Sequence, residues 1–347
     1  MKRFLSLLLV FILALSLLAG CNNDDTKTRT RKWTTANTTT TTKPSTTTTP
    51  TTTTPPVGNT DGISPAMWRV TGNNGETMYL LGTIHAGDKR SLTAMDMISD
   101  IFDKCDALAV EFDLVAYEND IEAMTKDYQQ FLYLDGTTIK DHLPSDLYSR
   151  AVALLKEANL YGSYLEYYNV AMWSQFVDQA ALELYSDLEG DYGMDSMLID
   201  KAYDKNMEVL SVESGSFQMA LTNSFSDELN ILILESSLEN ASSYGTELET
   251  LYSTWLSGDF EKLTALNTEE DFTGLTNEQI ELIKDYNYKL LDERNIGMGD
   301  KAVEYLQSGK TVFYAVGAAH MMGETGLVNR LTEEGYTVER IYLTNAQ

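Results

Sequence analysis

A short apolar run, a helical pattern and a second apolar run follow one another near the start of the folded part of the chain. Residues 78–81 and 107–112 are apolar and strand-like, and the turn signal Asn73-Asn74-Gly75 precedes the first of them. Between the two runs, residues 93–105 carry apolar side chains at helical spacing. This order predicts a β-α-β unit with parallel strands and a right-handed crossover.

The C-terminal end of the chain repeats this order. Residues 311–316 are β-branched and aromatic, residues 327–334 have a helical pattern, and residues 336–343 alternate as a strand does. A long stretch rich in helix formers separates the two units, with one strand predicted at 207–212 and helices at 144–159, 167–188, 194–206, 226–240, 246–257 and 277–307. The pattern therefore predicts an α/β fold, in which two β-α-β units form a small central sheet and a large helical insertion lies between them.

The N-terminus has the features of an export signal. Lys2 and Arg3 precede an apolar stretch over 4–18, which is shorter than the roughly 20 residues that a bilayer span needs. The stretch ends in Leu18-Ala19-Gly20-Cys21, which resembles the lipobox of bacterial lipoproteins. That resemblance implies cleavage before Cys21 and lipidation of its sulfur; the alternative is an ordinary cleaved signal with an incidental cysteine.

A low-complexity segment follows the export signal. Residues 22–60 consist largely of threonine runs punctuated by proline, a composition that cannot bury enough apolar surface to fold. We therefore predict a signal peptide at 1–20, a lipid-anchored, disordered Thr/Pro-rich linker at 21–62 and an α/β domain at 63–347. The expected location is the extracytoplasmic side of a bacterial cell membrane, where the lipid anchor holds the chain.

The charge and the cysteine content exclude two classes of protein. The chain has 25 Lys and Arg against 52 Asp and Glu, a net charge of −27, and this acidity repels phosphate backbones. Nucleic acid is therefore not an expected partner. Cys21 and Cys105 are the only cysteines, so lipidation of Cys21 leaves no partner for a disulfide. Cys105 lies in an apolar context and is expected to be packed.

The first strands of the two predicted units end in the same Gly-x-x-His motif, Gly82 to His85 and Gly317 to His320. The chain has three histidines, and two of them therefore occupy matching positions. Ligands of parallel α/β sheets bind at the carboxyl ends of the strands, so both histidines are candidates for a shared site. Glycines that would allow tight turns and close approach to a ligand stand in both motifs and after them, at Gly82, Gly87, Gly317 and Gly323.

Acidic residues and one arginine complete the candidate set. Glu111 and Asp113 lie at the end of the predicted strand 107–112 and are expected to point to the same face, and Glu213 follows the strand 207–212. Arg294 is a helix arginine, for which a surface ion pair is the alternative interpretation. Asp195 begins a helix, so a capping role competes with a functional one. The third histidine, His142, has no matching motif and is assigned a structural role.

Several motifs recur together in the TraB/GumN family, whose animal relatives are the TIKI proteins, and the chain resembles that family over roughly residues 67–343. The matching segments are 81–87, 110–113, 193–195, 212–214, 293–295 and 317–320 with Gly323 and Gly326-Leu327. The resemblance implies a tandem β-α-β core with helical additions. It also implies, through the TIKI proteins, metal-dependent hydrolysis of peptide bonds in secreted or membrane-linked proteins, and through more distant relatives a likeness to erythromycin esterases.

Three hypotheses for function follow. In the first, a metal-dependent hydrolase acts on an extracytoplasmic peptide or protein: His85, His320 and Glu111 hold manganese, zinc or cobalt, Glu213 or Asp113 acts as general base, and Arg294 stabilises the oxyanion. The second is an esterase-like hydrolase in which a histidine–carboxylate pair activates water without metal. The third is a non-catalytic module that binds a peptide or a surface protein. The His-Glu-x-x-His signature of zinc proteases and the Gly-x-Ser-x-Gly elbow of serine hydrolases are both absent from the sequence.

Overall fold

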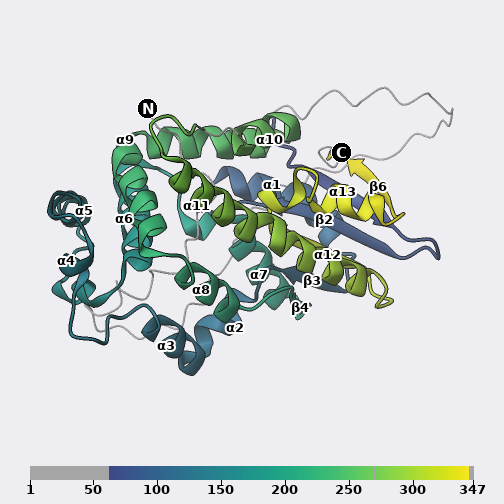
Figure 1. The fold of residues 1–347 in the computed structure, drawn as a ribbon. Coiled ribbons are helices and arrows are strands. Elements are labelled where there is room, and N and C mark those ends of the chain that lie inside the picture. The colour runs from purple at the N-terminus through teal and green to yellow at the C-terminus, as the bar shows by residue number, and fades with distance from the viewer. Residues whose placement is uncertain (1–61, 269–270, 344–347) are drawn as a thin grey trace. The chain divides into compact units, whose positions relative to one another are not determined.

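The computed structural model describes residues 62–268 and 271–343 (Figure 1). The predicted signal peptide, Cys21 and the Thr/Pro-rich linker up to residue 61 lie outside the described residues. Within the described ranges, every helix is too short or too polar to cross a membrane.

A six-stranded mixed sheet organises the described residues, with the strand order β4-β3-β5-β2-β1-β6. Neighbours are parallel from β4 to β2, whereas β1 pairs antiparallel with both β2 and β6. The strands are β1 (Met67–Thr71), β2 (Thr77–Thr83), β3 (Ala107–Val110), β4 (Glu208–Ser211), β5 (Val312–Gly317) and β6 (Thr337–Ile341). The α/β class with a small sheet is confirmed.

The strands of the two predicted β-α-β units interleave in this sheet. β5 lies between β2 and β3, the strands of the first unit, and β2 and β1 separate β5 from β6. Strand β1 is absent from the sequence-based prediction; it forms a hairpin with β2 through the turn that contains Gly75, where φ is +91°. Because β2 and β5 pair directly, with Thr83 opposite Gly317, the ends of the two Gly-x-x-His strands are adjacent.

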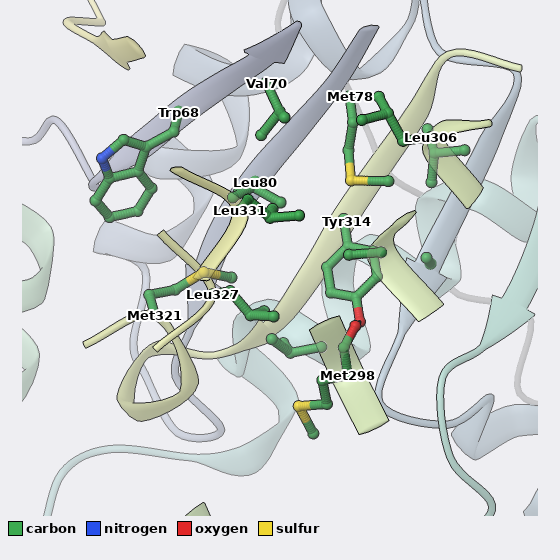
Figure 2. Close-up of a cluster of buried hydrophobic side chains, with 14 of the residues drawn as sticks. Trp68, Val70, Met78, Leu80, Met298, Leu306, Tyr314, Met321, Leu327 and Leu331 are labelled. Carbon is green, nitrogen blue, oxygen red and sulfur yellow. The ribbon is translucent and has the colours of Figure 1, made fainter. Parts of the chain in front are cut away.

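Helices cover both faces of the sheet. On one face, alternate residues of the strands pack against α12 (Glu293–Leu306) and α13 (Leu327–Glu333), as Figure 2 shows for Tyr314, Met298 and Leu331. On the other face, Phe313 packs edge-on against Phe102 of α1 (Arg90–Phe102), their ring centroids 5.2 Å apart. Burial of these alternating apolar positions is the main stabilising contribution to the sheet.

The predicted helical insertion is present, and two of its predicted helices form one longer helix. Its longest helix, α9 (Asp227–Ser257), is continuous through the gap predicted between 240 and 246. Gly245 does not interrupt it; the missing side chain lets the Tyr185 carbonyl of α6 (Val170–Tyr185) approach closely. The remaining helices are α2 (Leu114–Asn119), α3 (Ile121–Gln129), α4 (Ile139–His142), α5 (Ser145–Glu157), α7 (Met194–Asp204), α8 (Gly215–Asn223), α10 (Phe260–Thr268) and α11 (Asn277–Asn287).

Candidate functional site

The candidate residues gather at the carboxyl ends of the parallel strands. His85 follows β2, Glu111 follows β3, Glu213 follows β4 and His320 follows β5, so each of these strands delivers one polar side chain to the same edge. These four strands are consecutive neighbours in the sheet, in the order β4-β3-β5-β2. The arrangement is the one expected of an α/β sheet that binds a ligand at its strand ends.

His85 is held by a carboxylate. Its Nδ1 lies 2.7 Å from Asp195 Oδ2, and the Thr83 hydroxyl donates to Asp195 Oδ1 at 2.5 Å. Asp195 stands in the first turn of α7, and the Met194 amide of the same turn donates to the Ile84 carbonyl at 2.8 Å. Asp195 thus orients the His85 ring from a helix that is tied directly to the β2 loop.

His320 is held by an amide. The Asn295 side chain donates from Nδ2 to Thr325 Oγ1, so its Oδ1 is the atom that faces His320 Nδ1, at 2.7 Å. Nδ1 is therefore the protonated nitrogen, and Nε2 is left as an acceptor 3.8 Å from Glu111 Oε1. His320 is buried, in contrast to His85, whose side chain is 38% exposed.

A buried ion network fixes Glu111. Arg294 donates to Glu111 Oε2 at 2.7 Å and to both oxygens of Glu213, at 3.0 and 2.8 Å. Gln218 bridges the same two carboxylates from Nε2, and the Gly317 amide donates to Glu111 Oε1 at 2.9 Å. Arg294 is buried and follows the π-helical turn Tyr288–Asp292, so the alternative of a surface ion pair is wrong.

His85, His320 and Glu111 line one cavity of about 90 Å³, together with Thr83 and Arg294. Gly317 stands at its centre: a Cβ added there would lie 3.1 Å from Glu111 Oε1, 3.6 Å from His320 Cδ2 and 3.9 Å from His85 Nε2. The absent side chain of Gly317 is therefore what leaves room between the three groups. Gly82 has a related role, because a Cβ there would come within 2.8 Å of the Ala318 Cα, so the two motifs pack on each other.

The site sets the two imidazoles in opposite protonation states. Burial lowers the pKa of His85, but the Asp195 carboxylate outweighs burial and raises this pKa to about 9. Burial and the Arg294 cation lower the pKa of His320 to about 3. Burial would raise the pKa of Glu111, yet Arg294 and the two histidines hold it well below its usual range. At neutral pH the site thus contains a cationic His85, a neutral His320 and an ionised Glu111.

Three of the predicted residues lie elsewhere. Asp113 caps α2 by accepting from the Ala116 amide at 3.0 Å, and its other oxygen accepts from the Tyr203 hydroxyl at 2.8 Å. Because β3 ends at Val110, strand alternation does not extend to Asp113, and the expectation that it faces the same way as Glu111 fails. Gly87 approaches the Tyr192 carbonyl and the Ser91 side chain. Gly323 adopts a left-handed φ of +75° in the loop after His320.

The two remaining residues discussed from sequence have structural contacts. His142 stacks on Tyr133 with ring centroids 4.0 Å apart, and its Nε2 lies 2.9 Å from the Thr137 hydroxyl. Cys105 is buried, and burial raises the pKa of its thiol to about 12. Neither residue lines the cavity that holds His85 and His320.

The structure adds supporting residues that the sequence did not single out: Thr83, Gln218 and Asn295. Asn295 directly follows Arg294, and Thr83 lies inside the first Gly-x-x-His motif. Their position beside candidate residues could have indicated that they belong to the site. Gln218 in α8 had no such signal, because nothing local marks a helix glutamine as a bridge between two carboxylates.

Within residues 62–268 and 271–343, no three His, Cys, Asp or Glu side chains stand close enough to form a preassembled metal site.

Comparison with known proteins yields a family match. The sequence model described as the TraB/PrgY/gumN family matches residues 66–340, which include every residue of the cavity described above. The resemblance drawn from the motifs is thereby confirmed. Searches of curated proteins and of solved structures return no significant match.

Proposed function

This chain belongs to the TraB/PrgY/gumN family, and we propose that it is a metal-assisted hydrolase of peptide or protein substrates outside the cytoplasmic membrane, where Cys21 would anchor it. The observation that carries the proposal is the convergence of His85, Glu111 and His320 on one cavity at the strand ends. Convergent polar groups with shifted pKa values in a concave site are typical of catalytic centres.

The chemistry of the donors suits a divalent cation, although the three side chains would have to move closer together than they lie in the described residues to hold one. Metal-bound histidines characteristically use one ring nitrogen for the metal and give the other to a carboxylate or carbonyl oxygen. His85 meets Asp195 and His320 meets Asn295 through Nδ1 in this way, which leaves both Nε2 atoms for a ligand. Two imidazole nitrogens and one carboxylate oxygen suit zinc, manganese or cobalt. His320 is already neutral, whereas His85 would have to release its proton to bind a cation.

Glu111, Arg294 and Glu213 would have different roles in a site that holds a cation. When bound, a divalent cation would lower the pKa of a water molecule to about 7 and polarise the substrate carbonyl. Glu111 stays ionised beside Arg294 and would share in binding the cation through its negative charge. Arg294 already donates hydrogen bonds to both Glu213 and Glu111. We therefore assign Arg294 a positioning role and not oxyanion binding, and we assign Glu213 a positioning role and not base catalysis.

The pair formed by His85 and Asp195 supports a second candidate, hydrolysis without metal. Their 2.7 Å contact is the histidine–carboxylate pairing that activates water or a nucleophile in many hydrolases. Because His85 is protonated at neutral pH, in that version it would donate a proton to the substrate and would act as a base only after releasing that proton, while Glu111 and His320 bind the reacting group. General acid–base catalysis of this kind contributes about 10²–10⁴-fold to the rate.

Substitution of the histidines tests the proposal. Purified protein is assayed for hydrolysis of a mixture of peptides and for bound manganese and zinc, with His85→Ala, His320→Ala and, as matched control, His142→Ala. We expect the first two variants to lose about 10²-fold or more in rate and to lose the metal, and His142→Ala to keep both. Unchanged hydrolysis and metal content in His85→Ala and His320→Ala would overturn the proposal. Activity that withstands a strong chelator would select the metal-free version.

A further inference from the structure

The cavity at the strand ends has a second wall that the polar residues do not form. Apolar side chains from the helical insertion line it: Leu251 and Trp255 from α9, Leu263 from α10, and Leu290 and Leu291 from the π-helical turn before Arg294. Trp255 is fixed in place, because its indole Nε1 donates to the Gly82 carbonyl at 2.7 Å. The apolar wall is thus tied directly to the first Gly-x-x-His motif.

The size of the cavity restricts what can occupy this wall. An apolar protein cavity of about 150 Å³ can hold a benzene molecule, whereas this one has about 90 Å³, and part of that space borders His85, Glu111 and His320. The cavity is partly open to solvent, so this volume describes the space against its walls, and that space suits a branched aliphatic group better than an aromatic ring. Asn267 of α10 adds an amide to the same lining, which can serve the polar backbone that carries such a group.

We propose that the wall formed by Leu251, Trp255, Leu263, Leu290 and Leu291 is a specificity subsite that receives one aliphatic side chain of a peptide substrate. This inference rests on the proposed function. The side chain would belong to a residue that flanks the cleaved bond, because the wall and the reactive groups border the same small cavity. Leucine-sized residues are preferred: they fill the space, alanine leaves part of it empty, and aromatic or charged residues do not fit its size or its chemistry.

The test changes the size of the subsite in both directions at Leu251, which is half-buried on α9. Acetylated tetrapeptide amides Ala-Ala-Xaa-Ala, with Xaa as Leu, Ala, Phe or Glu, are N-methylated at the amide after Xaa to resist hydrolysis. Their binding to the full chain is measured by calorimetry, and cleavage of the unmethylated peptides is measured in parallel. Leu134→Ala is the matched control, because Leu134 is 85% exposed and does not line the cavity.

For the unmodified protein we expect the Leu peptide to bind about tenfold or more tightly than the Ala and Glu peptides. Leu251→Ala should shift the preference toward Phe and Leu251→Phe toward Ala, whereas Leu134→Ala should keep the original order. Equal affinity for all four peptides, no binding at all, or an order of affinities that stays the same in both Leu251 variants would overturn the inference. Selective binding without cleavage would support the subsite and refute the proposed hydrolase activity. Cleavage without selectivity would support the hydrolase activity and refute the subsite.

Discussion

At the scale of single residues, the site depends on one side chain that is missing. Gly317 has an ordinary φ of −46° as the residue before the turn that carries His320, so its backbone would accept alanine. The Cβ itself would be tight, because it would lie 3.1 Å from Glu111 Oε1 and would push this carboxylate aside by a few tenths of an ångström, and it would also fill space toward His320 and His85. The second motif therefore requires glycine for space at the reactive centre, and not for backbone conformation.

We predict that Gly317→Ala lowers activity while the fold survives. Displacement of catalytic groups by about 1 Å costs about 10²-fold in rate, and the shift needed here is smaller, so we expect a loss of up to about 10²-fold in peptide hydrolysis. Gly297→Ala is the matched control, because a Cβ at this exposed position of α12 meets nothing within 4 Å. It should retain activity and gain about 0.4–1 kcal/mol of stability in urea unfolding. A fully active Gly317→Ala protein would show that the three groups do not act together.

At the scale of elements, the contact between α6 and α9 contains a half-buried acid. Asp178 of α6 bonds to Ser237 of α9, and burial raises its pKa from 3.8 to about 7. Burial, and to a smaller extent the Asp178 charge, raise the pKa values of Tyr244 and Tyr286, which lie on α9 and α11. The packing of the helical insertion is therefore sensitive to pH near neutrality.

The sign of this effect follows from the direction of the shift. A carboxyl whose pKa is higher in the folded than in the unfolded protein favours folding when protonated, so its contribution is complete below about pH 4 and disappears as pH rises through about 7. We expect the unfolding free energy of the unmodified protein to fall by on the order of 1–3 kcal/mol relative to Asp178→Asn between pH 5 and 8. Urea unfolding of both proteins across this range measures it, and parallel pH profiles would contradict it.

At the scale of the whole molecule, the sequence predicts a lipid-anchored domain on a Thr/Pro-rich linker. The described residues supply the folded part, and the anchor at Cys21 stays a prediction from the leader sequence. An anchor and a linker would keep the cavity near the membrane while leaving the substrate to approach from outside the cell.

Replacement of Cys21 tests this organisation. Cys21→Ser removes the sulfur that would carry the lipid, so we expect the protein to move from the membrane fraction to the aqueous phase and to lose incorporation of labelled fatty acid. Cys105→Ser is the control, since Cys105 is buried in the domain and should leave both measurements unchanged. Retention of Cys21→Ser on the membrane, with lipid attached, would refute the anchor.

The features of this protein that depend on local pattern could be predicted from its amino-acid order. The strands ending at Thr83 and Gly317, the α/β class and the matching Gly-x-x-His motifs could be predicted, because apolar periodicity and turn residues act over a few positions. Which side chains contact one another became clear from the folded arrangement alone. Asp195 reaches His85 across 110 positions, Arg294 reaches Glu111 across 183, and Asp113 turns away to cap a helix. Such partners are set by strand order and helix packing, which no local pattern of polar and apolar residues encodes.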